Sequence, residues 1–230
     1  MNSKFITIYL IIQILLFLLI KISDYYVSNL VYACVRFIFI VINAIFATKI
    51  FIDSSKKFQR NVDLLFIGLW TTVIADLFLV LLPNIFPSFD SISTLLGFSF
   101  FVVVQTIYAF YLGMSRKSII IRSVAILILW ALLIWADKFS ISLAVGGINI
   151  VMLTVNVFTA WYLWLHDRSC NKLLFAIAIS CFLICDYSIV FKSVTSGVSY
   201  EIFRFLVWSA YAPAQILIVF TYMTRKLKKY

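Results

Sequence analysis

Long apolar runs separated by short polar or charged breaks follow one another along the whole chain. A helix needs about 20 apolar residues to cross the roughly 30 Å of hydrocarbon in a bilayer. Read on this scale, the pattern predicts eight spans: Phe5–Ile20, Ser28–Ile52, Val62–Leu82, Ile92–Met114, Ser118–Ala136, Phe139–His166, Leu173–Phe191 and Phe205–Met223. We therefore expect an all-α, polytopic membrane helix bundle that forms a single transmembrane domain over residues 1–230.

Two of the runs have a second interpretation. The first run follows Lys4, as in a signal peptide, but it ends in the segment Lys21–Asp24 without a small-residue cleavage site. We therefore expect a retained helix. The sixth run is unusually long, and the pair Gly146-Gly147 suggests that it divides into a short re-entrant segment and a span.

Composition and charge agree with a membrane protein. The chain is 64% hydrophobic and only 12% charged, whereas soluble domains are about 25% charged. The formal net charge is +10, but the cations lie between the apolar runs. They indicate contacts with the headgroups of membrane lipids and no nucleic-acid partner. The short loops suit a multi-pass protein of the cell membrane, with a bacterial plasma membrane as the expected host.

The basic residues predict the orientation of the spans. One side carries 14 of the 19 lysines and arginines, namely Lys4, Lys49, Lys56, Lys57, Arg60, Arg116, Lys117, Arg122, Arg168, Lys172, Arg225, Lys226, Lys228 and Lys229. The other side carries Lys21, Lys138, Lys192 and Arg204, and Arg36 lies inside a span. Because basic residues concentrate on the cytoplasmic side, both termini are predicted to be cytoplasmic.

Three ionisable residues fall inside predicted spans: Arg36 in the second, Asp76 in the third and Asp186 in the seventh. Burial of a charge in a bilayer is costly, so such residues usually serve a function. The two aspartates lie about 9 Å from the outer ends of their helices and Arg36 about 12 Å from its own, at 1.5 Å per residue. Their common depth and opposite charges predict a shared site.

Polar residues recur at helical spacing in four predicted spans, so that each set lies on one face of its helix. The stripes consist of Asn29, Tyr32, Arg36 and Asn43; of Gln105 and Tyr108; of Asn149 and Asn156; and of Arg204, Trp208, Tyr211, Gln215 and Tyr222. Such faces turn towards a polar interior and away from lipid. Two interpretations stay open: substrate binding, or hydrogen bonding between helices. Arg36 is equally open to a role as a counter-ion or as a side chain that reaches the headgroups.

An internal repeat is suggested by equal spacings. Asp76 and Asp186 are 110 residues apart, as are Gln105 and Gln215. This offset equals four spans, so it would relate two halves of the same orientation in a parallel four-plus-four arrangement.

Metal chemistry has little support in the sequence. His166 is the only histidine, and the four cysteines show no metal-ligand spacing. A zinc hydrolase with three histidine ligands is therefore excluded, whereas an ion bound by carboxylates stays open. We expect no metal and no cofactor.

Four spans contain short motifs of characteristic spacing. The third contains Ala75-Asp76-x-x-Leu79, which resembles the small-Asp-x-x-Leu signature of the YhhN family of lysoplasmalogenase-like membrane proteins. The others are similar to its Gly-Phe-His-Tyr, Ser-Asp and Tyr-Ala-Gln-Leu-Ile patterns: Gly97-x3-Phe101-x3-Gln105-x2-Tyr108, Cys185-Asp186 and Tyr211-x2-Ala214-Gln215-x-Leu217-Ile218. Length and span number agree with the family. Ala75, Gln105 and Cys185 depart from the usual Gly, His and Ser, and Gln105 cannot relay a proton.

The resemblance implies hydrolysis of the vinyl ether bond of a lysoplasmalogen, a lysophospholipid substrate, to a fatty aldehyde and a glycerophospho-alcohol. This reaction begins with protonation of the enol carbon by an acid that is still protonated near neutral pH. Burial and a neighbouring carboxylate both favour a protonated carboxyl group. We therefore expect Asp76 and Asp186 to form the acid/base pair, with their two roles unassigned.

Further residues complete the predicted site. Arg36, Gln105, Tyr108, Tyr211 and Gln215 are expected to bind substrate, and Arg36 or Arg204 to hold its phosphate. Two other functions stay open: a proton-coupled carrier of lipids or small molecules, which would use paired membrane acids, and a lipid-binding relative without catalysis, as Gln105 would allow. A retinal-type photoreceptor is disfavoured because Lys192 lies at the end of its predicted helix.

Overall fold

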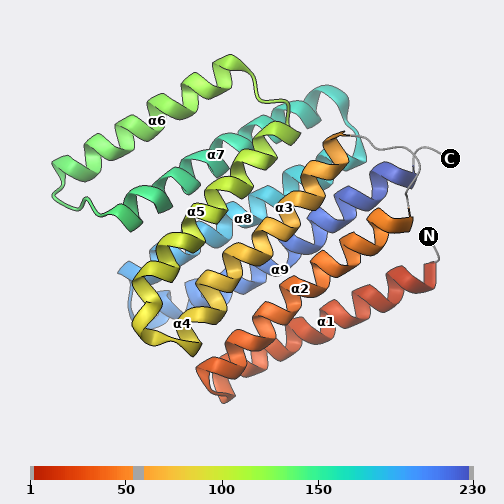
Figure 1. Cartoon of the computed structure of the whole chain (residues 1–230), viewed down its shortest axis with the longest axis horizontal. Helices are drawn as coiled ribbons and strands as arrows, with labels where there is room; N and C mark the ends of the chain where they lie inside the picture. Colours follow the sequence, from red (N-terminus) through yellow and green to blue (C-terminus); the bar gives the residue numbers. More distant parts are fainter. Residues whose placement is uncertain (1–2, 54–59, 228–230) are drawn as a thin grey trace. The chain divides into compact units, whose positions relative to one another are not determined.

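The computed structural model describes residues 3–53 and 60–227, and within them it contains helices and no strand (Figure 1). In chain order the elements are α1 (Ser3–Tyr26), α2 (Asn29–Asp53), α3 (Arg60–Asp76), the π-helical η1 (Leu77–Leu81), α4 (Leu82–Ile85), the 3-10 helix η2 (Pro87–Phe89), α5 (Asp90–Tyr111), α6 (Arg116–Trp135), α7 (Ile141–Asp167), α8 (Cys170–Val194) and α9 (Gly197–Leu227).

Eight helical segments in this described part are long and apolar enough to cross a membrane, which confirms the predicted number. The third consists of the consecutive α3, η1 and α4 and is apolar over Leu64–Ile85. The largest difference is at the last span, which begins at Gly197 and not at Phe205. Of the cations used to predict orientation, Lys56, Lys57, Lys228 and Lys229 lie outside the described residues, and the cytoplasmic placement of the termini stays a prediction.

The predicted division of the sixth run is wrong. The run forms one continuous helix, α7, and Gly147 lies in its second turn. A Cβ atom at this position would collide with Leu129 of α6. The glycine therefore allows close helix packing, as small residues commonly do between membrane helices, and it does not break the helix.

Serine caps fix where two of the helices begin. Ser115 precedes α6 and accepts a hydrogen bond from the backbone N–H of Ser118, at 3.2 Å. Ser140 precedes α7 and accepts one from Leu143, also at 3.2 Å. Each cap satisfies a donor in the first turn that has no partner within its helix.

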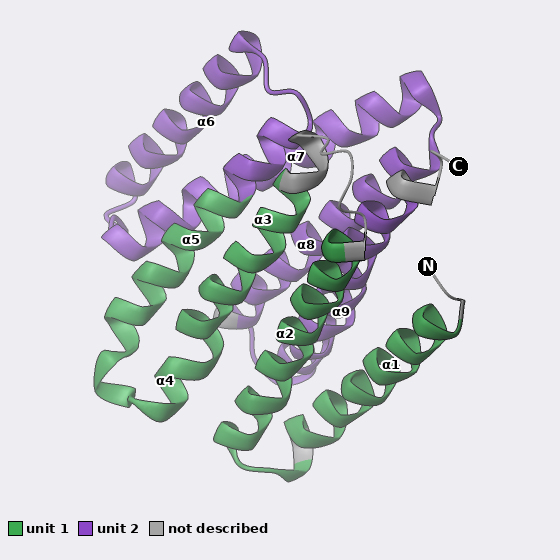
Figure 2. Cartoon of the chain, turned by 45° about the vertical axis from the view of Figure 1, so that its right-hand side comes forward, with its two compact units in different colours: residues 1–104 green, residues 105–230 purple. Residues whose placement is uncertain are grey.

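The chain separates into two compact units, residues 1–104 and residues 105–230, coloured green and purple in Figure 2. In unit 1, α2 packs against α1 and α3. Stacked rings of Tyr9 and Phe46 join α1 to α2, with centroids 3.9 Å apart. The indole N–H of Trp70 on α3 donates to Thr48 of α2 at 3.0 Å.

Unit 2 is a sequential series in which α6 packs on α7, α7 on α8 and α8 on α9. Trp130 of α6 donates to the carbonyl of Ala144 on α7, at 3.3 Å. Trp161 of α7 donates to Ser180 of α8, at 2.9 Å. These indole N–H groups thus find partners inside the protein, as the absence of water at membrane depth requires.

Candidate functional site

The residues predicted for the site fall in both units. Arg36 and Asp76 belong to unit 1, whereas Gln105, Tyr108, Asp186, Tyr211 and Gln215 belong to unit 2. The predicted pairing of Asp76 with Asp186, and the repeat that would relate them, stay predictions.

Asp186 of α8 is held by an amide from the neighbouring helix. The side-chain N–H of Asn149 on α7 donates to Asp186 Oδ2 at 2.8 Å. Asn149 is buried and Asp186 is half-buried. Among the described side chains, this hydrogen bond is the only polar contact of the Asp186 carboxyl group. One carboxyl oxygen is thus fixed by a neutral donor, and no cation of residues 3–53 or 60–227 forms an ion pair with the group.

A second polar cluster lies further along the same face of α7. The side-chain N–H group of Asn156 donates to both oxygens of Gln105 on α5, to the backbone carbonyl at 2.9 Å and to Oε1 at 3.1 Å. Gln105 is 2% exposed. The predicted site residue Gln105 therefore acts in this structure as an acceptor for a neighbouring helix.

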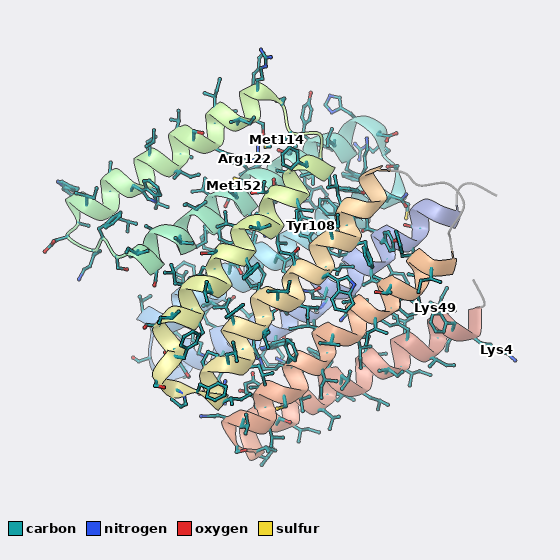
Figure 3. All side chains as sticks on the ribbon, in the orientation of Figure 1. Lys4, Lys49, Tyr108, Met114, Arg122 and Met152 are labelled. Atoms are coloured by element: carbon teal, nitrogen blue, oxygen red, sulfur yellow. The ribbon has the colours of Figure 1, made fainter. Side chains whose placement is uncertain are left out.

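Arg122 completes that cluster, and it is a residue that the sequence interpretation misplaced. It was counted with the loop cations, but it lies within the second turn of α6 and is 3% exposed. Its Nη2 donates to Asn156 Oδ1 at 2.6 Å, and its Nη1 donates to the backbone carbonyl and the hydroxyl of Ser118. Figure 3 labels this side chain between α6 and α7. The sequence does not distinguish it from a loop cation, because it follows the apolar triplet Ile119–Ile121 near the end of a predicted span.

The predicted residues of α9 form a small aromatic and amide cluster. Gln215 Nε2 donates to the hydroxyl of Tyr211 one turn earlier, at 3.0 Å, and Gln215 is fully buried. Tyr211 contacts the rings of Trp208 and Phe182, with centroids 5.1 and 5.4 Å away. Of the stripe predicted on this helix, Tyr211 therefore faces α8.

Tyr108 of α5 is also buried within unit 2. Its ring meets Phe175 of α8 edge-to-face, with 5.6 Å between centroids. The label in Figure 3 shows its place on the C-terminal part of α5. Tyr108 and Gln105 thus lie one turn apart on α5. Gln105 contacts α7, whereas Tyr108 contacts α8.

In unit 1, Asp76 lies where the third span changes geometry. It is the last residue of α3, directly before the π-helical η1, and it is 4% exposed. Single π turns inside α-helices occur frequently at functional sites. Arg36 lies over the ring of Tyr32, with 4.8 Å from its guanidinium carbon to the ring centroid.

The described residues include no group of three or more His, Cys, Asp and Glu side chains that could hold a metal ion.

Comparison with family models finds one described as the YhhN family, which matches residues 31–222. The matched range includes Asp76, Gln105, Asp186 and Gln215, whereas α1 precedes it. Comparisons with curated proteins and with solved structures find no match.

Proposed function

Because the chain belongs to the YhhN family, whose model covers most of its length, we propose that it is a lysoplasmalogenase-like hydrolase. The substrate is a lysophospholipid with a vinyl ether chain, and the products are a fatty aldehyde and a glycerophospho-alcohol. Such an amphiphile is already dissolved in the bilayer. Polar side chains on transmembrane helices can therefore bind it directly from the membrane. A chain with eight helices that can span a membrane is consistent with such a substrate.

The observation that carries the proposal is the Asp186 carboxyl group, half-buried in a span and held by Asn149. We assign it the role of general acid. A neighbouring cation would hold it ionised, and none among the described residues contacts it. Asn149 holds Oδ2 in place, so that Oδ1 is left to deliver a proton to the enol carbon.

Asp76 is assigned the role of general base. Protonation of the enol carbon turns the vinyl ether into an oxocarbenium ion. Water adds to its electron-poor carbon and gives a proton to the base, which yields a hemiacetal. The hemiacetal then breaks its C–O bond to release aldehyde and alcohol, with no net change in protons. Asp76 suits this role because it is buried, and because the adjacent π turn alters the direction in which side chains leave the helix.

The test uses purified full-length protein in detergent, with a lysoplasmalogen and an ester-linked lysolipid as alternative substrates. Mass spectrometry follows aldehyde and fatty acid. We expect aldehyde from the first lipid and no fatty acid from the second. Asp76→Asn and Asp186→Asn should each lower the rate by about a hundredfold or more, whereas the exposed Asp90→Asn serves as a matched control. Full activity in both variants, or cleavage of neither lipid by folded protein, contradicts the proposal.

A proton-coupled carrier is the second candidate, and the π turn after Asp76 favours it. Carriers often place binding sites where the regular geometry of a membrane helix changes, and the third span changes from α-helical to π-helical geometry directly after an acidic residue. Uptake of lysolipid into proteoliposomes, driven by a pH gradient and abolished by Asp76→Asn, distinguishes this function. Aldehyde release without such uptake favours the hydrolase.

A further inference from the structure

Arg122 is the only buried residue of α6. The remainder of this helix presents apolar side chains outwards, among them Ile119, Ile120 and Ile121 in the turn that precedes the arginine. A peripheral membrane helix therefore turns its one internal arginine towards the protein and its isoleucines towards the lipid. Since burial of a charge is costly, this placement requires a compensating partner.

The partners of Arg122 inside the protein are all neutral. They are the carbonyl and hydroxyl of Ser118 and the amide oxygen of Asn156. No carboxylate of the described residues lies within ion-pair distance, and the Nε atom is buried without a hydrogen-bond acceptor. The protein thus orients the guanidinium group but supplies neither its counter-charge nor its last acceptor.

The surroundings favour an anion from the bilayer. Arg122 lies six residues after Arg116, about 9 Å from the start of α6 at 1.5 Å per residue. This is the end of the helix where backbone N–H groups and the helix dipole attract negative charge. The exposed Arg116 and Lys117 add positive charge at the same end.

We propose that Arg122 and Asn156 form a binding site for the phosphate group of a glycerophospholipid. The phosphate oxygens accept hydrogen bonds from Nε and from the remaining hydrogen of Nη2 of Arg122. This is the fork geometry in which arginine binds phosphate. Asn156, held by Gln105, fixes the plane of the guanidinium group. The acyl chain lies along the exposed isoleucines of α6. This site stands independently of the proposed hydrolase activity.

The experiment measures equilibrium binding of an alkyl-ether lysophospholipid to the full-length protein in neutral detergent. This probe lacks the vinyl ether bond and is not cleaved, so binding is measured without turnover. The Arg122 and Asn156 variants described below distinguish this site from the proposed active site. A monoalkylglycerol of the same chain length has the same ether bond and lacks only the phosphate headgroup. We expect the lysophospholipid to bind at least about tenfold more tightly, as for one charge-assisted contact. Equal binding of the two probes overturns the proposal.

Variants locate the contact. Arg122→Gln should weaken lysophospholipid binding about tenfold, whereas Arg116→Gln, which removes an exposed charge from the same helix end, should change it less than twofold. Asn156→Asp is the sharper variant, because it places a carboxylate beside the intact Arg122 and supplies the missing counter-charge. We expect folded Asn156→Asp protein to lose the preference for the phosphate-bearing probe. Retention of that preference in Asn156→Asp, or in folded Arg122→Gln, overturns the site.

Inorganic phosphate distinguishes a lipid site from a site for the free anion. At millimolar concentration it should displace little of the bound lysophospholipid, because the acyl chain contributes to binding along α6. Complete displacement would show that the free anion is the ligand and would overturn the assignment to a lipid.

Discussion

At the scale of single residues, two asparagines of α7 organise the polar interior of unit 2. Asn149 holds Asp186, and Asn156 joins Gln105 to Arg122. The two asparagines are seven residues apart, which is two helical turns and about 10 Å along one face. Neutral amides can donate and accept at once, so each connects two helices without adding a charge to the membrane.

Replacement of Asn149 tests its effect on Asp186. Asn149→Leu removes the one hydrogen bond that the described residues give the carboxyl group. We expect kcat to fall about three- to tenfold, since a hydrogen bond to an uncharged group contributes about 0.5–1.5 kcal/mol. Steady-state kinetics on the lysoplasmalogen measures this effect. Thr154→Val on the same helix is the control, because its hydroxyl bonds only to its own helix at Ile150. An unchanged kcat in Asn149→Leu would show that Asp186 needs no positioning.

Gln105 and Asn156 should differ in their effects on stability. In Gln105→Leu, Asn156 keeps its hydrogen bond to the backbone carbonyl of residue 105, so we expect a loss of about 1 kcal/mol or less. In Asn156→Leu, Arg122 loses its partner on α7 and keeps only Ser118. The loss should reach about 3 kcal/mol, because Nη2 of a buried charged group is left without its acceptor. Thermal unfolding in detergent compares the two. Equal destabilisation would contradict this ranking.

The sequence revealed some of these residues and concealed others. Asp186 and the pair Asn149 and Asn156 could be found because a polar residue is conspicuous in an apolar helix. Arg122 could not, because an arginine near the end of a span has the same appearance whether it faces the cytoplasm or an adjacent helix. Hydrogen bonds between residues 34 and 51 positions apart depend on helix packing, which local spacing does not encode.

At the scale of helices, the third span combines α-helical and π-helical geometry. The ring of Phe78 in η1 stacks on Phe100 of α5, with centroids 5.6 Å apart. Gly97 of α5 lies so close to Leu79 that a Cβ atom there would collide with the leucine, and that atom would also lie 3.2 Å from the carbonyl oxygen of Ala75. Gly97 therefore permits the π turn to approach α5, beside Asp76.

Enlargement of Gly97 should disturb this contact. Gly97→Val forces Leu79 and the π turn away from α5, and we expect a cost of about 1–3 kcal/mol, as for other overpacked interiors. Thermal unfolding measures the cost, and the aldehyde assay reports any displacement of Asp76. Val103→Ile, on the exposed side of the same helix, adds a methylene without a close neighbour. Equal stability of Gly97→Val and Val103→Ile would contradict the close approach.

Spans were predictable because length and apolarity alone determine them. Their internal geometry was not. Leu77–Leu81 is an ordinary apolar segment, and nothing in its composition distinguishes a π turn from an α turn. Gly146-Gly147 suggested a break because glycine weakens isolated helices. In α7, packing on α6 and α8 outweighs that local preference.

At the scale of the whole molecule, the boundary between the two units falls inside α5, after Val104. Each unit has its own set of internal contacts. The predicted four-plus-four repeat stays a hypothesis. The spacing of 110 residues between Asp76 and Asp186 suggested equivalent positions in the two halves of a repeat. The distance between them depends on the packing of one unit on the other, which no spacing along the chain determines.

Orientation is open to a direct test. The excess of lysine and arginine on one side predicts cytoplasmic termini. In a bacterial host, a C-terminal fluorescent protein should therefore fluoresce, and a C-terminal alkaline phosphatase should be inactive. Fusions after Lys138, in the predicted outer loop, should give the opposite result. An active C-terminal phosphatase would reverse the orientation of every span.

The contact between Arg122 and Asn156 also has a consequence for biogenesis. During synthesis α6 leaves the ribosome before α7, so Arg122 reaches the insertion machinery before its partner exists. An arginine in a lone helix raises the free energy of insertion, by up to about 2.5–3.5 kcal/mol if it lies at the helix centre. The connection between α6 and α7 comprises only residues 136–140, so the two helices can be released into the bilayer together as a hairpin. We therefore expect α6 to remain at the translocon until α7 arrives.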